Sequence, residues 1–511
     1  MLLHPPSFAA ANAHRSAWSS ASPHGGLRRK RAQRVAEFEN ESRISPTASA
    51  RWHSALRHAF GSRRSLLGAA GWVSATFIAQ QALRLVSNVV LAWLLAPSLL
   101  GTMLLINTLR TGGELITDVG VGQSIVNNPR GNEPAFYNTA WTIQILRGLV
   151  LFALAIALTI PIAHLYGKPE LLVLLPAVAP IFILTGLTSP ARFLLQKRLE
   201  IRKLALFDLA AALFGTAAQI ALALYTPTIW ALVWGLLIGT AGPAAASFFL
   251  IDWRSHRLRW EKEAVKAVIH FGKWVFLSSL IYFLAMNFDR LYFADAIPLA
   301  LLGVYGIART FADTITLLFQ RMGSLLIFPK VSASRQRGLD LQRAIRPIRL
   351  VTLLVAATGL ALAVALADRF IYLLYDERYH AAGFFLSILL VGSWFGILAT
   401  MADSMMMGVG KPSGVAFSNG AKLAVIAVAL PLLLPRYGMN AALFTFVLAD
   451  AVRYAMLAWR KRGVGLSFLR QDAALTLFFL LLIFLFREAT MLAGLTEGIG
   501  AWLAQAGTPL V

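Results

Sequence analysis

The stretch PIRLVTLLVAATGLALAVALADRFIYLL, residues 347–374, decides the fold class. From Leu350 to Ala367 it carries no charged side chain, and a helix of about 20 apolar residues is long enough to cross a bilayer. Backbone groups in lipid have no water to bond, so a spanning segment of this kind must pair its own N–H and C=O groups. The stretch therefore predicts a transmembrane helix.

Comparable apolar runs follow one another from Ser65 onward, separated by short polar breaks. The twelve predicted spans cover about residues 67–95, 99–126, 138–163, 170–194, 205–226, 229–251, 268–294, 299–328, 347–374, 381–408, 413–434 and 439–459. A thirteenth run, Ala473–Phe486, is intensely apolar, whereas the stretch from Ala489 is weakly hydrophobic and leaves a fourteenth span open. The expected fold is an all-α polytopic membrane protein.

The composition agrees with a membrane protein. Of the 511 residues, 58% are hydrophobic and only 14% are charged, against about 25% charged in an average soluble domain, which excludes a soluble enzyme. The lack of cysteine excludes disulfides, thiolate zinc sites and cysteine nucleophiles. The histidines are scattered without the spacing of metal ligands, so we expect no metal and no cofactor.

The excess of 47 basic over 24 acidic residues (47 − 24 = +23) falls largely in every second loop. Lysine and arginine mark the cytoplasmic loops of membrane proteins. The basic set of loops contains Arg130, Arg192, Lys197, Arg198, Arg202, Lys203, Arg254, Arg257, Arg259, Lys262, Lys266, Lys330, Arg335, Arg337, Arg343, Arg346, Lys411, Arg460, Lys461, Arg462 and Arg470. The opposite set holds little beyond Lys168, Arg378 and Arg436. This bias predicts a cytoplasmic N-terminus, and it explains most of the charge without a nucleic-acid partner.

The same pattern suggests how the chain is divided. Residues 1–64 are basic and lack a long apolar run, so we expect a disordered cytoplasmic tail; a headgroup or nucleic-acid role for its basic segment Leu27–Arg34 is the weaker interpretation. The expected divisions after the tail are an N-terminal six-helix lobe at 65–252, a basic cytoplasmic linker at 253–267, a C-terminal six-helix lobe at 268–460 and one or two further membrane helices at 461–511.

An internal repeat supports two lobes. A shift of 202 residues aligns Trp72-Val73 with Trp274-Val275, and Leu99-Leu100-Gly101 with Leu301-Leu302-Gly303 (303 − 101 = 202). The shift corresponds to six predicted spans, and an even number gives both halves the same orientation. The repeat thus predicts two parallel lobes related by an axis along the membrane normal, with a central cavity between them.

Polar side chains inside the spans gather on the first two helices of each half. Ionisable groups at membrane depth are costly and by default face the bundle interior or a wet cavity. The candidates for substrate binding are Arg84, Arg110, Arg290, Arg309, Asn107 and Tyr305. The candidates for ion coupling are Glu114, Asp118 and Asp313. Arginines in a wet cavity suit an anionic head group such as a diphosphate; ion pairs that only fix helix packing are the alternative.

Several short motifs resemble one known family. They are Phe271-Gly-Lys-Trp274, Asn287-Phe-Asp289-Arg290-Leu, Leu302-Gly303-Val-Tyr305-Gly-Ile-Ala308, Ala96-Pro97-Ser-Leu-Leu-Gly101 and Gly408-Val-Gly410-Lys411-Pro412. Over residues 65–460 the chain resembles bacterial polysaccharide (O-antigen type) flippases of the multidrug/oligosaccharidyl-lipid/polysaccharide exporter superfamily. Members generally begin just before the first span, and the long basic tail departs from that pattern.

The resemblance implies two lobes that rock between inward- and outward-facing states in the bacterial inner membrane. The substrate it implies is an undecaprenyl-diphosphate-linked oligosaccharide that crosses to the periplasmic leaflet for exopolysaccharide or O-antigen export. It further implies a monomeric transport unit, in contact with membrane lipid and with polysaccharide polymerase or export partners, rather than an enzyme.

Three alternatives stay open at this point. A cation-coupled multidrug exporter or a lipid II flippase belongs to the same superfamily. A membrane glycan polymerase or glycosyltransferase is less favoured, because the predicted loops are too short for a catalytic domain. The Gly408–Pro412 turn lacks the spacing and the Ser/Thr of a P-loop, so the sequence predicts no built-in ATPase.

Overall fold

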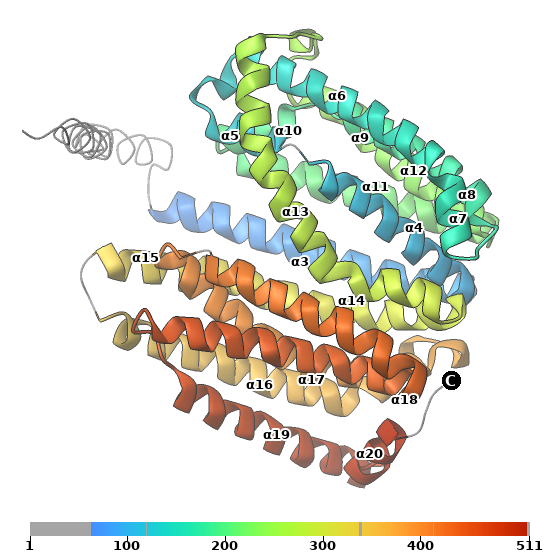
Figure 1. Cartoon of the computed structure of the whole chain (residues 1–511), viewed down its shortest axis with the longest axis vertical. Coiled ribbons are helices and arrows are strands. Elements are labelled where there is room, and N and C mark those ends of the chain that lie inside the picture. Colours follow the sequence, from blue (N-terminus) through green and yellow to red (C-terminus); the bar gives the residue numbers. More distant parts are fainter. Residues whose placement is uncertain (1–62, 119, 337–339, 412, 508–511) are drawn as a thin grey trace, which may run out of the picture. The chain divides into compact units, whose positions relative to one another are not determined.

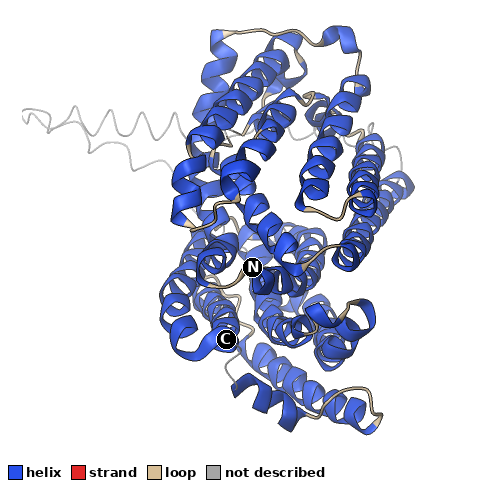
Figure 2. Cartoon of the chain, turned by 90° about the vertical axis from the view of Figure 1, so that its right-hand side faces the viewer, coloured by secondary structure: helices blue, strands red, loops and turns tan. Residues whose placement is uncertain are grey.

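The computed structural model describes residues 63–118, 120–336, 340–411 and 413–507. Within these ranges the regular structure is entirely helical (Figures 1 and 2), as the apolar runs predict. The contacts and cavities that follow lie within Gly71–Val511, the second of the two units into which the chain divides. The predicted tail at 1–64 falls almost wholly outside the described residues.

Helices of the first half follow the predicted spans. Their bounds are α3 (Arg63–Leu94), α4 (Pro97–Ile116), α5 (Val121–Asn127), η1 (Pro129–Asn132), α6 (Pro134–Ala157), α7 (Thr159–Leu165), α8 (Leu171–Val178), α9 (Pro180–Leu187), α10 (Ala191–Lys197), α11 (Ile201–Tyr225), α12 (Ile229–Ser247), η2 (Phe248–Leu250) and η3 (Trp253–Ser255). The second span is shorter than predicted because α4 ends at Ile116. The fourth is broken, with a bend of 44° between Leu171–Leu187 and Ala191–Lys197.

The second half is built in the same way. Its elements are α13 (Lys262–Ala296), α14 (Leu299–Met322), η4 (Gly323–Ile327), α15 (Phe328–Gln336), α16 (Leu341–Leu374), η5 (Glu377–Tyr379), α17 (Ala381–Gly408), α18 (Ser413–Arg462), α19 (Leu469–Leu492) and α20 (Ile499–Gly507). The thirteenth predicted run is α19. With nine residues, α20 is too short to cross a bilayer. Within the described ranges, nine helices are long and apolar enough to span, or ten with the bent pair.

The long helix α18 contains two of the predicted spans. Gly438 interrupts it with φ 73° and ψ −169°, a conformation that only glycine adopts without strain. The two parts run back along each other, since Lys422 before the break donates to Asp450 after it, at 2.7 Å. The sequence therefore predicts two spans here correctly, and the glycine supplies the turn between them.

The two halves of the internal repeat meet through equivalent glycines. At the start of α4 and α14 the backbones touch so closely that a Cβ on Gly101 would lie 1.9 Å from the Leu299 carbonyl oxygen. A Cβ on Gly303 would lie 2.0 Å from the Pro97 carbonyl oxygen. Both relations obey the 202-residue shift (299 − 97 = 303 − 101 = 202), so the contact is reciprocal, as a two-fold relation requires. The faint sequence repeat thus corresponds to a structural one.

Further hydrogen bonds join the halves at this same end of the helices. The indole of Trp93, near the end of α3, donates to the Leu374 carbonyl at the end of α16, at 2.6 Å. The Tyr379 hydroxyl donates to the Leu95 carbonyl at 2.9 Å and is fully buried. Together with the glycine contact they hold the two halves against each other at this end.

The extra helix α19 is an integral part of the second half and lies along α16 (Figure 1). Near one end of the pair, Arg349 of α16 forms a salt bridge with Asp472 of α19. Near the other end, Asp368 of α16 pairs with Arg487 of α19 at 2.7 Å. Both arginines are buried, and an ion pair that loses one buried partner leaves a costly bare charge. These two pairs fix the position of α19 along α16.

Candidate substrate cavity

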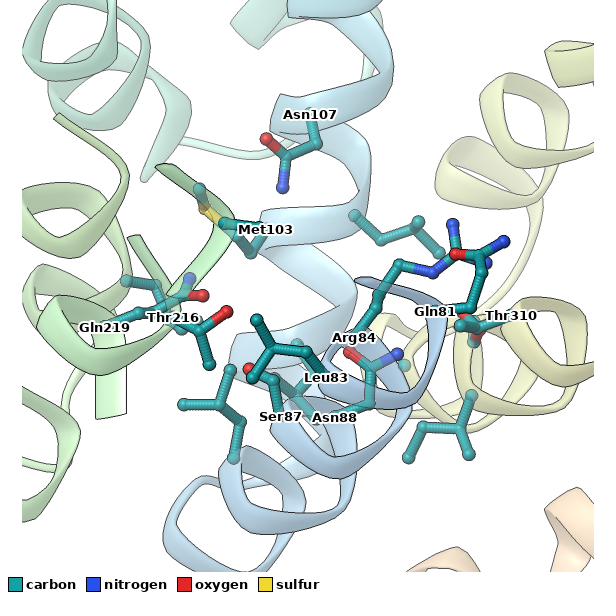
Figure 3. A pocket seen from close by; sticks show the side chains of 18 of the residues that line it. Gln81, Leu83, Arg84, Ser87, Asn88, Met103, Asn107, Thr216, Gln219 and Thr310 are labelled. Atoms are coloured by element: carbon teal, nitrogen blue, oxygen red, sulfur yellow. The ribbon is translucent and has the colours of Figure 1, made fainter. Parts of the chain in front are cut away.

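The described residues of the two halves enclose a central cavity of about 500 Å³. It is lined by α3, α4, α11, α12 and α14, and Gly303 lies on its wall, so the glycine contact closes one side of it. Its volume is within the range of small-molecule sites. Figure 3 shows side chains of these helices converging on the open space.

The lining of the cavity is rich in uncharged polar groups. They are Gln80, Gln81, Ser87, Asn88, Asn107, Thr216, Gln219 and Thr310. Amides and hydroxyls both donate and accept hydrogen bonds, which matches the hydroxyl groups of a sugar. Among the described residues the Oδ1 atom of Asn107 is buried without a hydrogen-bond partner. A buried acceptor of this kind is costly unless a ligand or water supplies the donor.

Arg84 brings the one formal charge among the residues that line the cavity. It projects from α3 beside Gln81 and Thr310 (Figure 3) and donates to the Thr314 hydroxyl of α14 at 2.7 Å. No carboxylate within the described residues forms a salt bridge with it. Asp313 is close enough to act on its charge, but no salt bridge among the described residues holds the guanidinium, which can therefore still meet an anion in the cavity. Its hydrogen bond links the two halves.

The predicted residues of the second half, Arg290, Tyr305, Arg309 and Asp313, form an ionic cluster with Asp289. Arg290 and Arg309 share Asp313, at 2.8 and 3.1 Å, and Arg309 also lies 3.7 Å from Asp289. The Tyr305 hydroxyl donates to Asp289 at 2.5 Å and is fully buried. Two arginines thus face two aspartates, so the cluster has no net charge. Thr314 follows Asp313 directly, which places the cluster next to the bond made by Arg84.

The predicted residues of α4 separate into two groups. Asn107 faces the central cavity, whereas Arg110 lines an apolar pocket of about 310 Å³ inside the first half. Arg110 pairs with Glu114 at 2.8 Å, the predicted i,i+4 contact. Asp118 lies beyond the end of α4, where it accepts a hydrogen bond from the Gly120 backbone at 2.9 Å. The structure therefore brings together Arg84 and Asn107 in one cavity, and the assigned roles of all nine residues stay predictions.

Some residues that line the cavity are not found by searching the spans for ionisable groups. Gln219 and Thr216 come from α11, and they are the polar side chains of its stretch Leu209–Leu224, which is otherwise apolar. Their spacing of three residues puts them on one helix face. That signal is present in the sequence, but neutral polar residues are common enough in spans that it does not identify a site.

Outside the spanning segments, ion pairs connect the linker to the first half. Arg130 in η1 donates to Glu261, just before α13, at 2.7 Å and to Glu133 at 2.8 Å. These two carboxylates raise the pKa of Arg130. Among the described residues no group of three histidine, aspartate or glutamate side chains could hold a metal.

Comparison with known proteins agrees with this architecture. A family described as "Polysaccharide biosynthesis protein" matches residues 90–383, more than half of the chain. The chain belongs to this family. Its match begins near the end of α3 and ends just inside α17, so it includes the ionic cluster and the cavity lining from α4, α11, α12 and α14. Arg84 and the neighbouring lining residues of α3 precede it.

Two curated relatives are similar over part of their length. The chain is 21% identical over 306 residues to the teichuronic acid biosynthesis protein TuaB of Bacillus subtilis, covering 58% of this chain and 62% of that protein. It is 20% identical over 321 residues to the lipopolysaccharide biosynthesis protein WzxC of Escherichia coli, covering 62% and 65%. The alignments thus span less than two thirds of either relative. They confirm the resemblance to polysaccharide flippases that the motifs indicate.

Two solved structures share the fold. An inward-closed lipid II flippase MurJ superposes with a TM-score of 0.69 at 14% identity, covering 85% of this chain and 95% of that one. An inward-facing multidrug resistance transporter of the MATE family gives 0.58 at 15% identity, covering 77% and 95%. Both confirm an all-helical, multi-pass membrane fold. At such identities they establish the fold alone.

Proposed function

We propose that this protein is a flippase that carries a lipid-linked, anionic oligosaccharide across the bacterial inner membrane. The observation that supports it best is Arg84, which forms no salt bridge within the described residues, on the wall of a cavity lined by amides and hydroxyls. A diphosphate takes the charge-assisted bonds of an arginine, and sugar hydroxyls take those of amides. Family membership and the printed names of the relatives, which concern teichuronic acid and lipopolysaccharide biosynthesis, support a glycan substrate.

The proposed mechanism is alternating access. In this mechanism the glycine contact and its neighbouring hydrogen bonds are the closed end of the cavity. We take that end as the periplasmic side, because the basic loops lie at the opposite ends of the helices. Substrate would enter from the cytoplasmic leaflet with its diphosphate at Arg84 and its sugars against the amides, while its prenyl chain stays in lipid. Opening of the α4–α14 contact would then release it on the other side, without a catalytic step.

The neutral ionic cluster has a separate place in this proposal. Arg290 and Arg309 are held by Asp289 and Asp313, so their bonds to a substrate would compete with carboxylates. Arg84 forms no salt bridge among the described residues, and Asp313 acts on it only from a greater distance. We therefore assign first contact with the diphosphate to Arg84, and to the cluster the task of holding α13 and α14 together.

A lipid II flippase is the second candidate, because the fold is shared with MurJ over most of the chain. Its substrate carries the same kind of anionic lipid head, so the cavity fits both. A multidrug exporter is less favoured, because amide and hydroxyl side chains line the cavity and no aromatic side chain is among its described lining residues.

Substitution of Arg84 tests the proposal. Loss of a charge-assisted bond to phosphate costs about 1.5–3 kcal/mol, so R84Q should slow transport of a fluorescent undecaprenyl-diphosphate glycan in proteoliposomes by about 10- to 150-fold. R84K should retain part of the rate. Arg321 is the matched control: it is also an arginine at the α3–α14 boundary, 5.2 Å from the Phe77 ring, but lies outside the cavity.

We expect R321Q to transport at the wild-type rate. Equal rates for R84Q, R321Q and the unaltered protein would show that Arg84 does not bind the diphosphate. Transport of lipid II by this protein at the same rate as other lipid-linked glycans would favour the second candidate.

A further inference from the structure

A second polar cavity of about 440 Å³ lies at the basic end of the C-terminal half. It forms between the end of α17 and the two ends of α18, next to Lys411. Its lining includes Lys411, Arg460, Arg462 and Trp459, together with Ser413 and Gly414 at the start of α18. It shares no lining residue with the central cavity.

The charge of this cavity is wholly positive. Three cations and no carboxylate line it, and within the described residues none of the three takes part in a salt bridge. The Nε atom of Arg460 is buried there without a hydrogen-bond partner among the described residues. The central cluster differs, because each of its arginines faces an aspartate. A cavity with three uncompensated cations fits an anion.

Its surroundings place this cavity at the surface of the bilayer. Trp459 and Phe417 are 62% and 57% exposed, and the Arg460 guanidinium lies over both rings, 4.6 Å from Phe417 and 5.6 Å from Trp459. Exposed aromatic rings next to basic groups are typical of the membrane–water interface. The first backbone N–H groups of α18, at Ser413 and Gly414, add positive partial charge.

We propose that this pocket binds the phosphate head group of an anionic membrane phospholipid. Basic pockets between membrane helices at the cytoplasmic surface recognise such head groups. Inorganic phosphate has the same charge chemistry, but it has no acyl chains to cover the exposed surface of Trp459 and Phe417. The bound lipid joins the end of α17 to both ends of α18. This site is separate from that of the transported substrate.

Lipid titration of the full-length protein tests the assignment. The purified chain in phosphatidylcholine is titrated with phosphatidylglycerol, and native mass spectrometry measures the bound lipid. We expect a saturable phosphatidylglycerol site that phosphatidylcholine does not occupy. Each surface cation contributes about fivefold to binding of an anionic lipid, so K411Q/R462Q should weaken it by about 25-fold. Both side chains are exposed, so this variant should fold, and R460Q provides a second one.

Matched controls come from the basic loop before α13. R257Q/R259Q removes the same charge from exposed positions outside the pocket. R254Q matches R460Q, because Arg254 also lies 5.6 Å from the ring of the tryptophan that precedes it. Unchanged binding in both controls supports the proposal. Equal binding of phosphatidylcholine, equal losses in the controls, or full displacement of the lipid by inorganic phosphate would each overturn it.

Discussion

Replacing Gly101 by alanine tests whether the contact between α4 and α14 closes the cavity. The new Cβ would lie 1.9 Å from the Leu299 carbonyl oxygen, whereas ordinary contact begins at 3.4 Å, so the helices would have to part by about 1.5 Å (3.4 − 1.9). Overpacking of this kind costs about 1–3 kcal/mol. The cost falls only on the state in which the helices touch, so the ratio of closed to open molecules should fall by about 5- to 150-fold.

Thiol labelling measures that ratio directly. The chain has no cysteine, so N88C places a single thiol on the wall of the central cavity. A membrane-impermeant maleimide, added from the side on which α4 and α14 begin, should react faster in N88C/G101A than in N88C. The reciprocal variant G303A should increase the rate similarly, because its Cβ would lie 2.0 Å from the Pro97 carbonyl oxygen.

The control is G359A, because a Cβ at Gly359 meets nothing within 4 Å. It should leave labelling unchanged. If the thiol of N88C reacts at the same rate in the G101A, G303A and G359A backgrounds, the contact between α4 and α14 does not control access of the maleimide to the central cavity. That result would refute the assignment of this contact as the closed end. A rise with G101A alone would contradict the two-fold relation between the halves.

Two further substitutions concern stability, measured by thermal unfolding in detergent. D472N leaves the fully buried Arg349 without its carboxylate and should lower the free energy of unfolding by about 3–5 kcal/mol. Recovery of stability in the double variant R349M/D472L would confirm that the unpaired charge is the cause. A loss of less than about 1 kcal/mol in D472N would contradict it. G438A forces a side chain into a conformation with φ 73° and should lower the free energy of unfolding by about 1–3 kcal/mol. G420A in the same helix, where a Cβ meets nothing within 4 Å, should leave it unchanged. Equal unfolding temperatures for the two variants would argue against strain at Gly438.

Much of the fold is predictable because a bilayer imposes simple local rules. A span must be long, apolar and self-paired, so stretches such as 381–408 coincide with their helix, α17. Breaks are less predictable. The second span is predicted to run to residue 126, yet α4 ends at Ile116 and α5 begins only at Val121, after Gly120 with φ 64°. A polar, glycine-containing segment can leave the helical conformation where neighbouring helices supply hydrogen-bond partners for its backbone. Those helices are distant in sequence, so the end of α4 cannot be read from the segment itself.

The candidate site shows the same division. Arg84 and Arg309 are both arginines in the first two helices of a half, and nothing local distinguishes them. The structure separates them because Arg309 forms salt bridges with Asp313, one helical turn away, and with Asp289 of α13. Arg84 forms no salt bridge within the described residues and donates to the Thr314 hydroxyl. Gln219 enters the cavity from a helix whose sequence carries no sign of a site.

The sequence by itself determined the class of molecule, the position of most spans, the repeat and the alternation of basic loops. Each of these depends on properties of a residue and its near neighbours in the chain, namely hydrophobicity, length and charge in lipid. Only the tertiary structure decided which arginines are held in salt bridges and which one forms none within the described residues. That outcome depends on the rotation and separation of helices far apart in sequence, because a charge is compensated only by a partner within a few ångströms.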